Sequence, residues 1–211
     1  MQTSNHRLRL ISPALGMPPQ SDAQVLGAVT WLLMQSRQHR ELPLRMLGTL
    51  VLPAVKTGQY ILLSERSAEA SAEESGAETP VAWLAWANVS AQAEACYLSD
   101  HLEGLRADEW SSGDRMWCIH WIAPFSHTPI LRRIVLDHVP NFCARALHHR
   151  GIERGMRVST FRGKNISPQR ARQWWRERPM LAAAPETPAA AQVADVSDTV
   201  SKPAPGGGAG L

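Results

Sequence analysis

Residues 110–125 place titratable side chains inside an aromatic and aliphatic stretch. The block holds three of the chain's eight tryptophans, and Asp114, Arg115 and His120 stand among them. A histidine has an ordinary pKa near 6.5, so it can take up or release a proton near neutral pH. In an apolar strand it can equally be a hydrogen-bonded core side chain, and an Asp–Arg pair beside a glycine is typical of a turn. On the residues alone, both interpretations stay open.

The run MWCIHWI at 116–122 follows a polar turn and predicts a central strand, which Pro124 ends. Because side chains alternate along a strand, Trp117, Ile119 and Trp121 are expected on one face. The opposite face is expected to hold Met116, Cys118, His120 and Ile122. We therefore expect the two tryptophans to be structural and the histidine to lie across the strand from them.

Helical and strand patterns alternate along the rest of the chain. Asp22 is a predicted N-cap, and apolar residues spaced by three and four after it indicate a helix. Residues 37–43 are expected to form a turn that carries His39. Further helices are expected at 44–51, 91–98, 129–139 and 167–178, and strands at 59–64, 81–87, 144–149 and 156–161. This mixture predicts an α/β or α+β domain with one mixed central sheet flanked by helices.

Composition divides the chain into one domain with two tails. Residues 1–21 are polar and contain proline, which indicates a loose arm, and residues 22–179 carry the periodic elements. Residues 67–79, rich in Ala, Ser and Glu, indicate an enlarged hairpin loop, an insertion that costs little free energy. The Ala/Pro/Gly-rich stretch at 180–211 buries too little apolar surface to order itself.

Charge and cysteine content narrow the function classes. The net charge is +3, but residues 182–211 carry −2, so the rest of the chain carries +5. Such a basic surface suits an acidic protein, a phosphate or nucleic acid. The three cysteines form no CxxC pair, and no metal, nucleotide or serine-hydrolase motif appears. Without a signal-like start or a long apolar run, the expected location is the cytoplasm, with no membrane span.

Four segments, in order, carry a resemblance to a known family. They are LGAVTWL at 26–32 with His39 and Arg40 beyond it, LPA at 52–54 with GQYILL at 58–63, PVAWLAWAN at 80–88, and SGDRMWCIHWIAPF at 112–125. These segments resemble the toxin-activating lysine acyltransferases encoded beside RTX toxins, whose signature looks like SGDRxWxIDWIAPF. The resemblance covers residues 25–178.

The resemblance implies an activity and its partners. Members of that family move a fatty acyl group from acyl carrier protein to internal lysines of a protoxin. The resemblance also implies that the protein forms a homodimer and has a fold similar to the Gcn5-related N-acetyltransferases. It implies no cofactor and no metal. The family's catalytic histidine falls on His39, its associated serine on Ser36, and its catalytic aspartate on His120. Asp114, Arg115 and Asn88 are expected in supporting roles, with an oxyanion site near residues 86–88.

The replacement of an aspartate by His120 keeps two hypotheses open. A carboxylate stabilises an imidazolium formed when the histidine base takes the lysine proton, whereas a second imidazole lacks that negative charge. The first hypothesis is an acyltransferase with His39 as base and His120 as its partner or a second base. The alternative is an altered or inactive homologue that binds a toxin-like partner or an acyl chain. Nucleic-acid binding is disfavoured, because the arginines lack aromatic interleaving and a docking helix.

Overall fold

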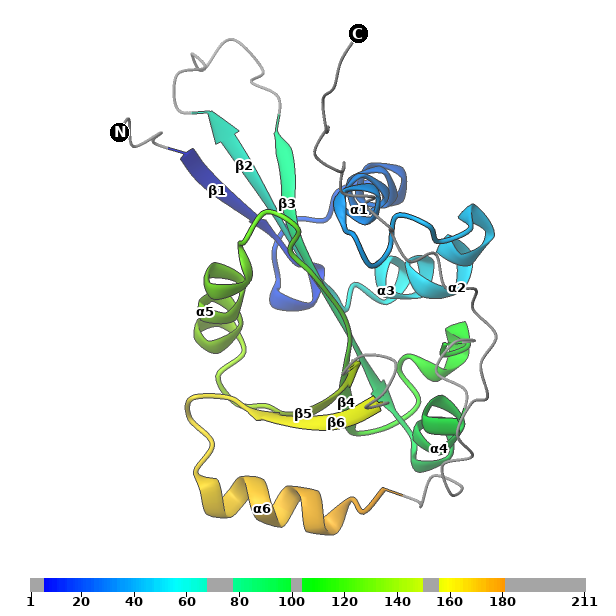
Figure 1. Ribbon diagram of the computed structural model, residues 1–211. Helices are drawn as coiled ribbons and strands as arrows, with labels where there is room; N and C mark the ends of the chain where they lie inside the picture. Colours follow the sequence, from blue (N-terminus) through cyan, green and yellow to red (C-terminus); the bar gives the residue numbers. More distant parts are fainter. Residues whose placement is uncertain (1–5, 68–77, 100–103, 150–155, 181–211) are drawn as a thin grey trace, which may run out of the picture.

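The computed structural model describes residues 6–67, 78–99, 104–149 and 156–180, which form one mixed sheet with helices on both faces (Figure 1). The strands are β1 (His6–Ile11), β2 (Tyr60–Ser67), β3 (Thr79–Val89), β4 (Arg115–Ile122), β5 (Cys143–His149) and β6 (Met156–Arg162). The helices are α1 (Asp22–Gln35), α2 (Leu47–Leu50), α3 (Leu52–Thr57), α4 (Ala91–Ser99), α5 (Thr128–His138) and α6 (Pro168–Glu177), with short 3-10 turns η1 (Pro13–Leu15), η2 (Leu44–Met46) and η3 (Ala107–Glu109).

The six strands lie in sequence order, β1 to β6. Each neighbouring pair is antiparallel except β4 and β5, which α5 connects and which run parallel. The parallel ladder is short: it pairs residues 116–118 of β4 with 144–146 of β5, so the end of β4 extends beyond its neighbour. The expected mixed central sheet flanked by helices is confirmed. The expected hairpin between β2 and β3 is also confirmed, and residues 68–77 of its loop lie outside the described part.

Two apolar cores lie on opposite faces of the sheet (Figure 1). The larger core joins the sheet to α1, α3 and α4 through residues such as Val29, Ala54 and Tyr97, with Trp83 and Trp117 on the sheet side. The smaller core packs α5 against the other face; its members include Ile61, Leu63, Leu84, Trp86 and Leu131. The two faces therefore have different neighbours, and the face on which a β4 side chain lies determines what it can contact.

A β-bulge in β4 overturns the expected alternation. Ala85 of β3 lies opposite His120 and Trp86 opposite Cys118, so Ile119 has no partner in β3. The extra residue reverses the faces of everything after it. His120 therefore lies on the α1–α4 side, and the prediction that it sits across the strand from Trp117 was wrong.

The same bulge separates the two β4 tryptophans. Trp117 is fully buried in the larger core, while Trp121 is 37% exposed and its indole N–H donates to Thr128 Oγ1 at 3.4 Å. Ile122 joins Trp117 in the larger core. The expectation that Trp121 is a core side chain was wrong.

We expect Trp117→Ala to lower the free energy of unfolding by about 3–5 kcal/mol, because it empties a fully buried site. Trp121→Ala is the matched control on the same strand and should cost about 1 kcal/mol or less. Urea denaturation of the two variants measures the difference. Equal losses in both would contradict the assignment of Trp121 to the surface.

The N-terminal elements differ from the sequence-based expectation at three points. Residues 6–11 of the predicted loose arm form β1, an edge strand paired with β2. Ser21, not Asp22, caps α1 through a capping box with Gln24. Pro53 begins α3 near its first position rather than ending the preceding helix, as proline's missing N–H allows. In the described residues, no helix is long and apolar enough to span a bilayer.

Candidate functional site

His39 lies in the turn expected after α1, and Ser36 builds that turn. The Ser36 carbonyl accepts the backbone N–H groups of His39 and Arg40, both at 3.0 Å. The Ser36 hydroxyl also lies 2.7 Å from Nδ1 of His39. With the proton on Nδ1, His39 donates to the hydroxyl and keeps a free lone pair on Nε2. The loop thus fixes the ring from both backbone and side chain.

His120 comes from β4 and reaches the end of α2. Its Nε2–H donates to the carbonyl oxygen of Leu50, the last residue of α2, at 2.8 Å. That carbonyl has no partner within its own helix, so the histidine satisfies it. The bond fixes the tautomer: the proton is on Nε2 and the lone pair is on Nδ1.

The structure brings the two histidines into one electrostatic environment. Burial, aided by the charge of His39 when it is protonated, lowers the pKa of His120 to about 4 against the opposing hydrogen bond to Leu50. Burial also lowers the pKa of His39. Near neutral pH both imidazoles are therefore uncharged. A neutral imidazole with a free lone pair can accept a proton, which is what a general base must do.

The expected oxyanion donors are already engaged. The amide of Trp86 donates to the carbonyl of Gln59 at 3.1 Å, and the amide of Asn88 donates to the carbonyl of Trp110 at 2.8 Å. The Asn88 side chain donates to the Gln59 amide oxygen at 2.9 Å, and Gln59 donates in turn to Ser111 Oγ at 2.7 Å. The amides of Trp86 and Asn88 are therefore not free to form the expected oxyanion site. Asn88 instead ties the end of β3 to the turn before β4.

Asp114 and Arg115 serve the start of β4 rather than the histidines. Asp114 accepts two hydrogen bonds from Arg178, which hold its pKa below the usual value. Arg115 lies five residues before His120, about 16 Å along an extended strand. Gly113 lets this turn close, because a Cβ there would lie 2.5 Å from the carbonyl oxygen of Val89.

Glu94 of α4 is a buried carboxylate that the sequence analysis missed. It is fully buried and accepts hydrogen bonds from Arg115 at 2.5 Å, Arg145 at 2.7 Å and the Trp117 indole at 2.8 Å. Two cations and an N–H group thus offset the cost of burying its charge. Arg145 also donates to the carbonyl of Arg178, so the cluster joins α4, β4, β5 and the end of α6.

The structure gives little support for a cysteine nucleophile or a metal ion at the site. Burial raises the pKa of the Cys118 thiol to about 12, so it stays protonated and is a poor nucleophile. Across the described ranges, no three His, Cys, Asp or Glu side chains come together as a metal site requires. His39 and His120 form a pair of groups that can carry proton transfer.

Comparison with known proteins identifies the family of the chain. The profile of the RTX toxin acyltransferase family (HlyC) matches residues 18–162. The chain belongs to this family. It is 38% identical over 148 residues to the RTX-I toxin-activating lysine-acyltransferase ApxIC of Actinobacillus pleuropneumoniae, covering 70% of this chain and 79% of the relative.

Other relatives of this RTX toxin acyltransferase family member carry related names. The protein-lysine myristoyltransferase HlyC of Escherichia coli is 36% identical over 70% of this chain and 80% of its own. The leukotoxin-activating lysine-acyltransferase LktC of Mannheimia haemolytica, serotype T3, is 31% identical over 71% and 83%. The resemblance drawn from the four sequence segments is confirmed, and the matched region contains both His39 and His120.

Proposed function

We propose that this protein is a protein-lysine acyltransferase that moves an acyl chain from acyl carrier protein to internal lysines of an RTX protoxin. Family membership supports the acyl transfer to lysine and the toxin substrate. The observation that carries the proposal within the fold is a neutral histidine, His39, held in a turn by Ser36 beside a second neutral histidine. That acyl carrier protein is the acyl donor is proposed from the family resemblance.

The proposed reaction forms an amide bond and breaks a thioester. The uncharged lysine nitrogen attacks the thioester carbonyl, because a protonated amine has no lone pair for attack. His39 Nε2 takes the amine proton as the C–N bond forms. The C–S bond then breaks, and the proton passes from His39 to the leaving sulfur. No other reactant is needed, and His39 ends the cycle uncharged.

Ser36 and His120 have different proposed roles. Ser36 accepts the Nδ1–H of His39 and so orients the ring, which is the part played by a carboxylate in a serine-protease triad. His120 cannot supply a carboxylate's charge. Because its pKa is lowered to about 4, it stays neutral and leaves His39 the one group of the pair that takes a proton near pH 7.

The sheet topology supports a fold resembling the Gcn5-related N-acetyltransferases. Its features are an antiparallel run from β1 to β4, a parallel β4–β5 pair joined through α5, and a final β6 hairpin. Residues 119–122 of β4 have no partner in β5, and His120 lies in that stretch. We place the acyl thioester along this unpaired stretch.

The decisive test is product detection. The full chain is incubated with an acylated acyl carrier protein and a protoxin whose gene neighbours this one, and peptides are searched for acyl-lysine by mass spectrometry. We expect modification at a few internal lysines and none when the enzyme or the donor is omitted. Stable binding of protoxin with no acyl-lysine at any pH would favour the binding-protein alternative. The observation behind that alternative is that His120 stands where the family has an aspartate.

A further inference from the structure

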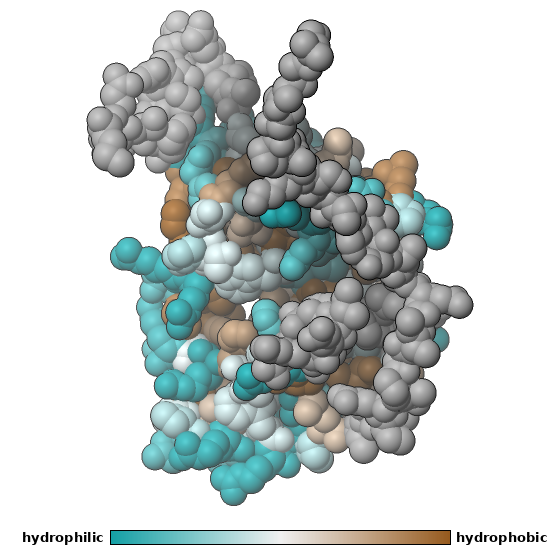
Figure 2. All heavy atoms as spheres, viewed as in Figure 1, coloured by the Kyte–Doolittle hydropathy of each residue, from teal (hydrophilic) through white to brown (hydrophobic). Residues whose placement is uncertain are grey.

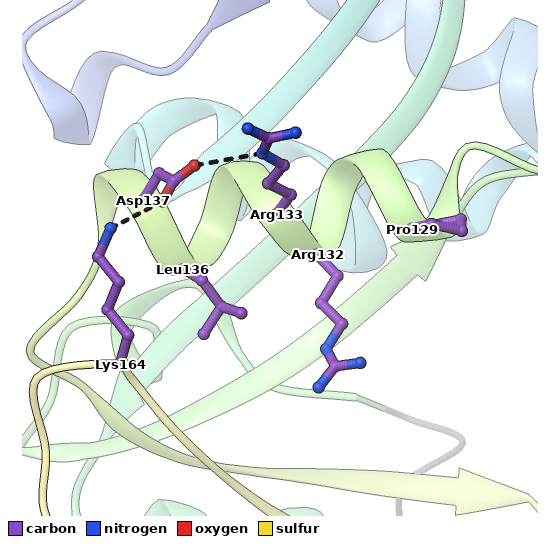
Figure 3. A pocket seen from close by; sticks show the side chains of 6 residues that line it. All are labelled: Pro129, Arg132, Arg133, Leu136, Asp137 and Lys164. Atoms are coloured by element: carbon purple, nitrogen blue, oxygen red, sulfur yellow. Dashed lines mark hydrogen bonds and ion pairs between the residues drawn. The ribbon is translucent and has the colours of Figure 1, made fainter.

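A shallow depression of about 340 Å³ lies along α5, beside the turn that precedes α6 (Figure 3). Its lining residues are Pro129, Arg132, Arg133, Leu136, Asp137 and Lys164. Five of them belong to α5, and Lys164 comes from the turn between β6 and α6. Side chains from two separate parts of the chain thus converge on one surface.

The depression is positively charged. Lys164 donates to Asp137 at 2.7 Å, and Arg133 lies 3.8 Å from the same carboxylate, so one anion is shared between two cations (Figure 3). Their charges hold the pKa of Asp137 below its usual value. With Arg132 included, three cations face one carboxylate, and the net charge is two positive.

Arg132 is the cation of this surface that has no ion-pair partner among the described residues. It is exposed on α5, and within the described ranges no hydrogen bond or ion pair engages its guanidinium. The Arg133 side chain is 87% exposed, and Leu136 between the charged groups is only partly buried. A surface with one unpaired cation, two cations that share a single carboxylate and a small apolar floor fits an acidic, amphipathic helix of a partner protein.

The depression also lies where a donor would have to approach. Its first residue, Pro129, stands in the first turn of α5, directly after the loop that follows the unpaired end of β4. A protein seated on α5 would therefore lie next to the loop that continues from that stretch. A second depression on α6, lined by Gln169, Gln173, Arg176 and Glu177, has no such neighbour and only one cation.

We propose that the α5 depression is the docking surface for the acidic carrier protein that delivers the acyl thioester. This inference rests on the proposed function, because that function requires such a donor. Charge attraction would hold the carrier protein through Arg132 and Arg133, with Lys164 at the far end. The apolar floor would add contact area at the centre.

The test measures binding separately from catalysis. Fluorescence anisotropy of labelled holo-acyl carrier protein gives the Kd for wild type, for Arg132→Glu with Arg133→Glu, and for a control pair, Arg172→Glu with Arg176→Glu on α6. Both double variants change the net charge by the same −4. We expect the α5 pair to raise Kd about tenfold or more and the α6 pair to change it about twofold or less. Added salt should weaken wild-type binding and affect the α5 variant less.

The outcomes separate this inference from the proposed function. Equal loss of binding in both double variants would mean that overall charge matters and would overturn the α5 assignment. Loss in the α6 pair alone would move the docking surface to α6. If wild type binds the carrier protein through α5 but forms no acyl-lysine, the docking surface stands and the transfer activity fails. If wild type does not bind the carrier protein, the inference is wrong.

Discussion

Replacing His39 with alanine should lower the rate of acyl transfer by about two to four orders of magnitude, the range typical of a lost general base. With the proton on Nδ1, where Ser36 Oγ lies 2.7 Å away, His39 has a lone pair on Nε2 for the amine proton. His120 is tied to Leu50 and has a pKa of about 4, so it is the weaker base. Single-turnover assays with one acyl donor measure the loss, and near-wild-type rates would remove His39 from the mechanism.

The pH dependence of the rate tests the same pair. Because burial lowers the pKa of His39, the wild-type rate should persist below pH 6.5 and fall only as His39 becomes protonated. His120→Asp places an anion near His39 and stabilises its protonated form, which raises that pKa. The acid limb of the His120→Asp profile should therefore lie at higher pH, with activity near neutral pH kept or increased.

Two controls accompany this comparison. Circular dichroism establishes that each variant is folded before its rate is read. Ser36→Ala keeps His39 but removes its orienting hydroxyl, so the rate should fall while the acid limb remains. A folded, inactive His120→Asp beside an active wild type would mean that His120 itself acts as the base. Activity in His120→Asp alone would favour the binding-protein alternative.

Glu94→Ala should lower the free energy of unfolding by about 3–5 kcal/mol, the cost of leaving a buried charge without its partner. Arg145 is 3% exposed, and Glu94 offsets the burial that lowers its pKa. Removing the carboxylate leaves Arg145 and Arg115 facing each other and also frees the Trp117 indole N–H. Denaturant titration with fluorescence detection measures the change.

The matched control for Glu94→Ala is Asp108→Ala. Asp108 also pairs with an arginine, Arg106, at 3.1 Å, but both side chains are more than 70% exposed. Exposed pairs contribute little, so this variant should change stability by about 1 kcal/mol or less. A loss for Glu94→Ala no larger than that of the control would show that the buried cluster does not stabilise the fold.

Local signals predicted much of the fold. The Ser-Pro pair at 167–168 predicted the start of α6, and the Ser167 hydroxyl indeed accepts the Arg170 amide at 3.2 Å. The strands β2 to β6 were expected close to their observed bounds, because their apolar runs are bounded by turns. β1 was missed, since it is short, follows a polar start and is defined by pairing with residues more than 50 positions away.

The site was less predictable than the fold. The resemblance identified His39, Ser36 and His120, but no local pattern reveals the bulge at Ile119 that brings His120 to the face of α2. Glu94 was missed because nothing in the sequence of α4 distinguishes a buried acid from an exposed one. Its partners are 21 to 51 residues away. The homodimer and the cytoplasmic location implied by the resemblance stay predictions.

The short parallel ladder between β4 and β5 joins two antiparallel units of the sheet. On one side, β1 to β4 form a continuous antiparallel unit, and on the other β5 and β6 form a hairpin; residues 116–118 and 144–146 join them. Trp117 and Arg145 are paired across this ladder, and the side chains of both donate hydrogen bonds to Glu94. The Glu94 carboxylate thus connects β4 to β5 where few backbone pairs join them. Beyond residues 116–118 no ladder pairing holds β4 to β5, so residues 119–122, with His120 among them, can change their distance from β5 without breaking a bond between these two strands.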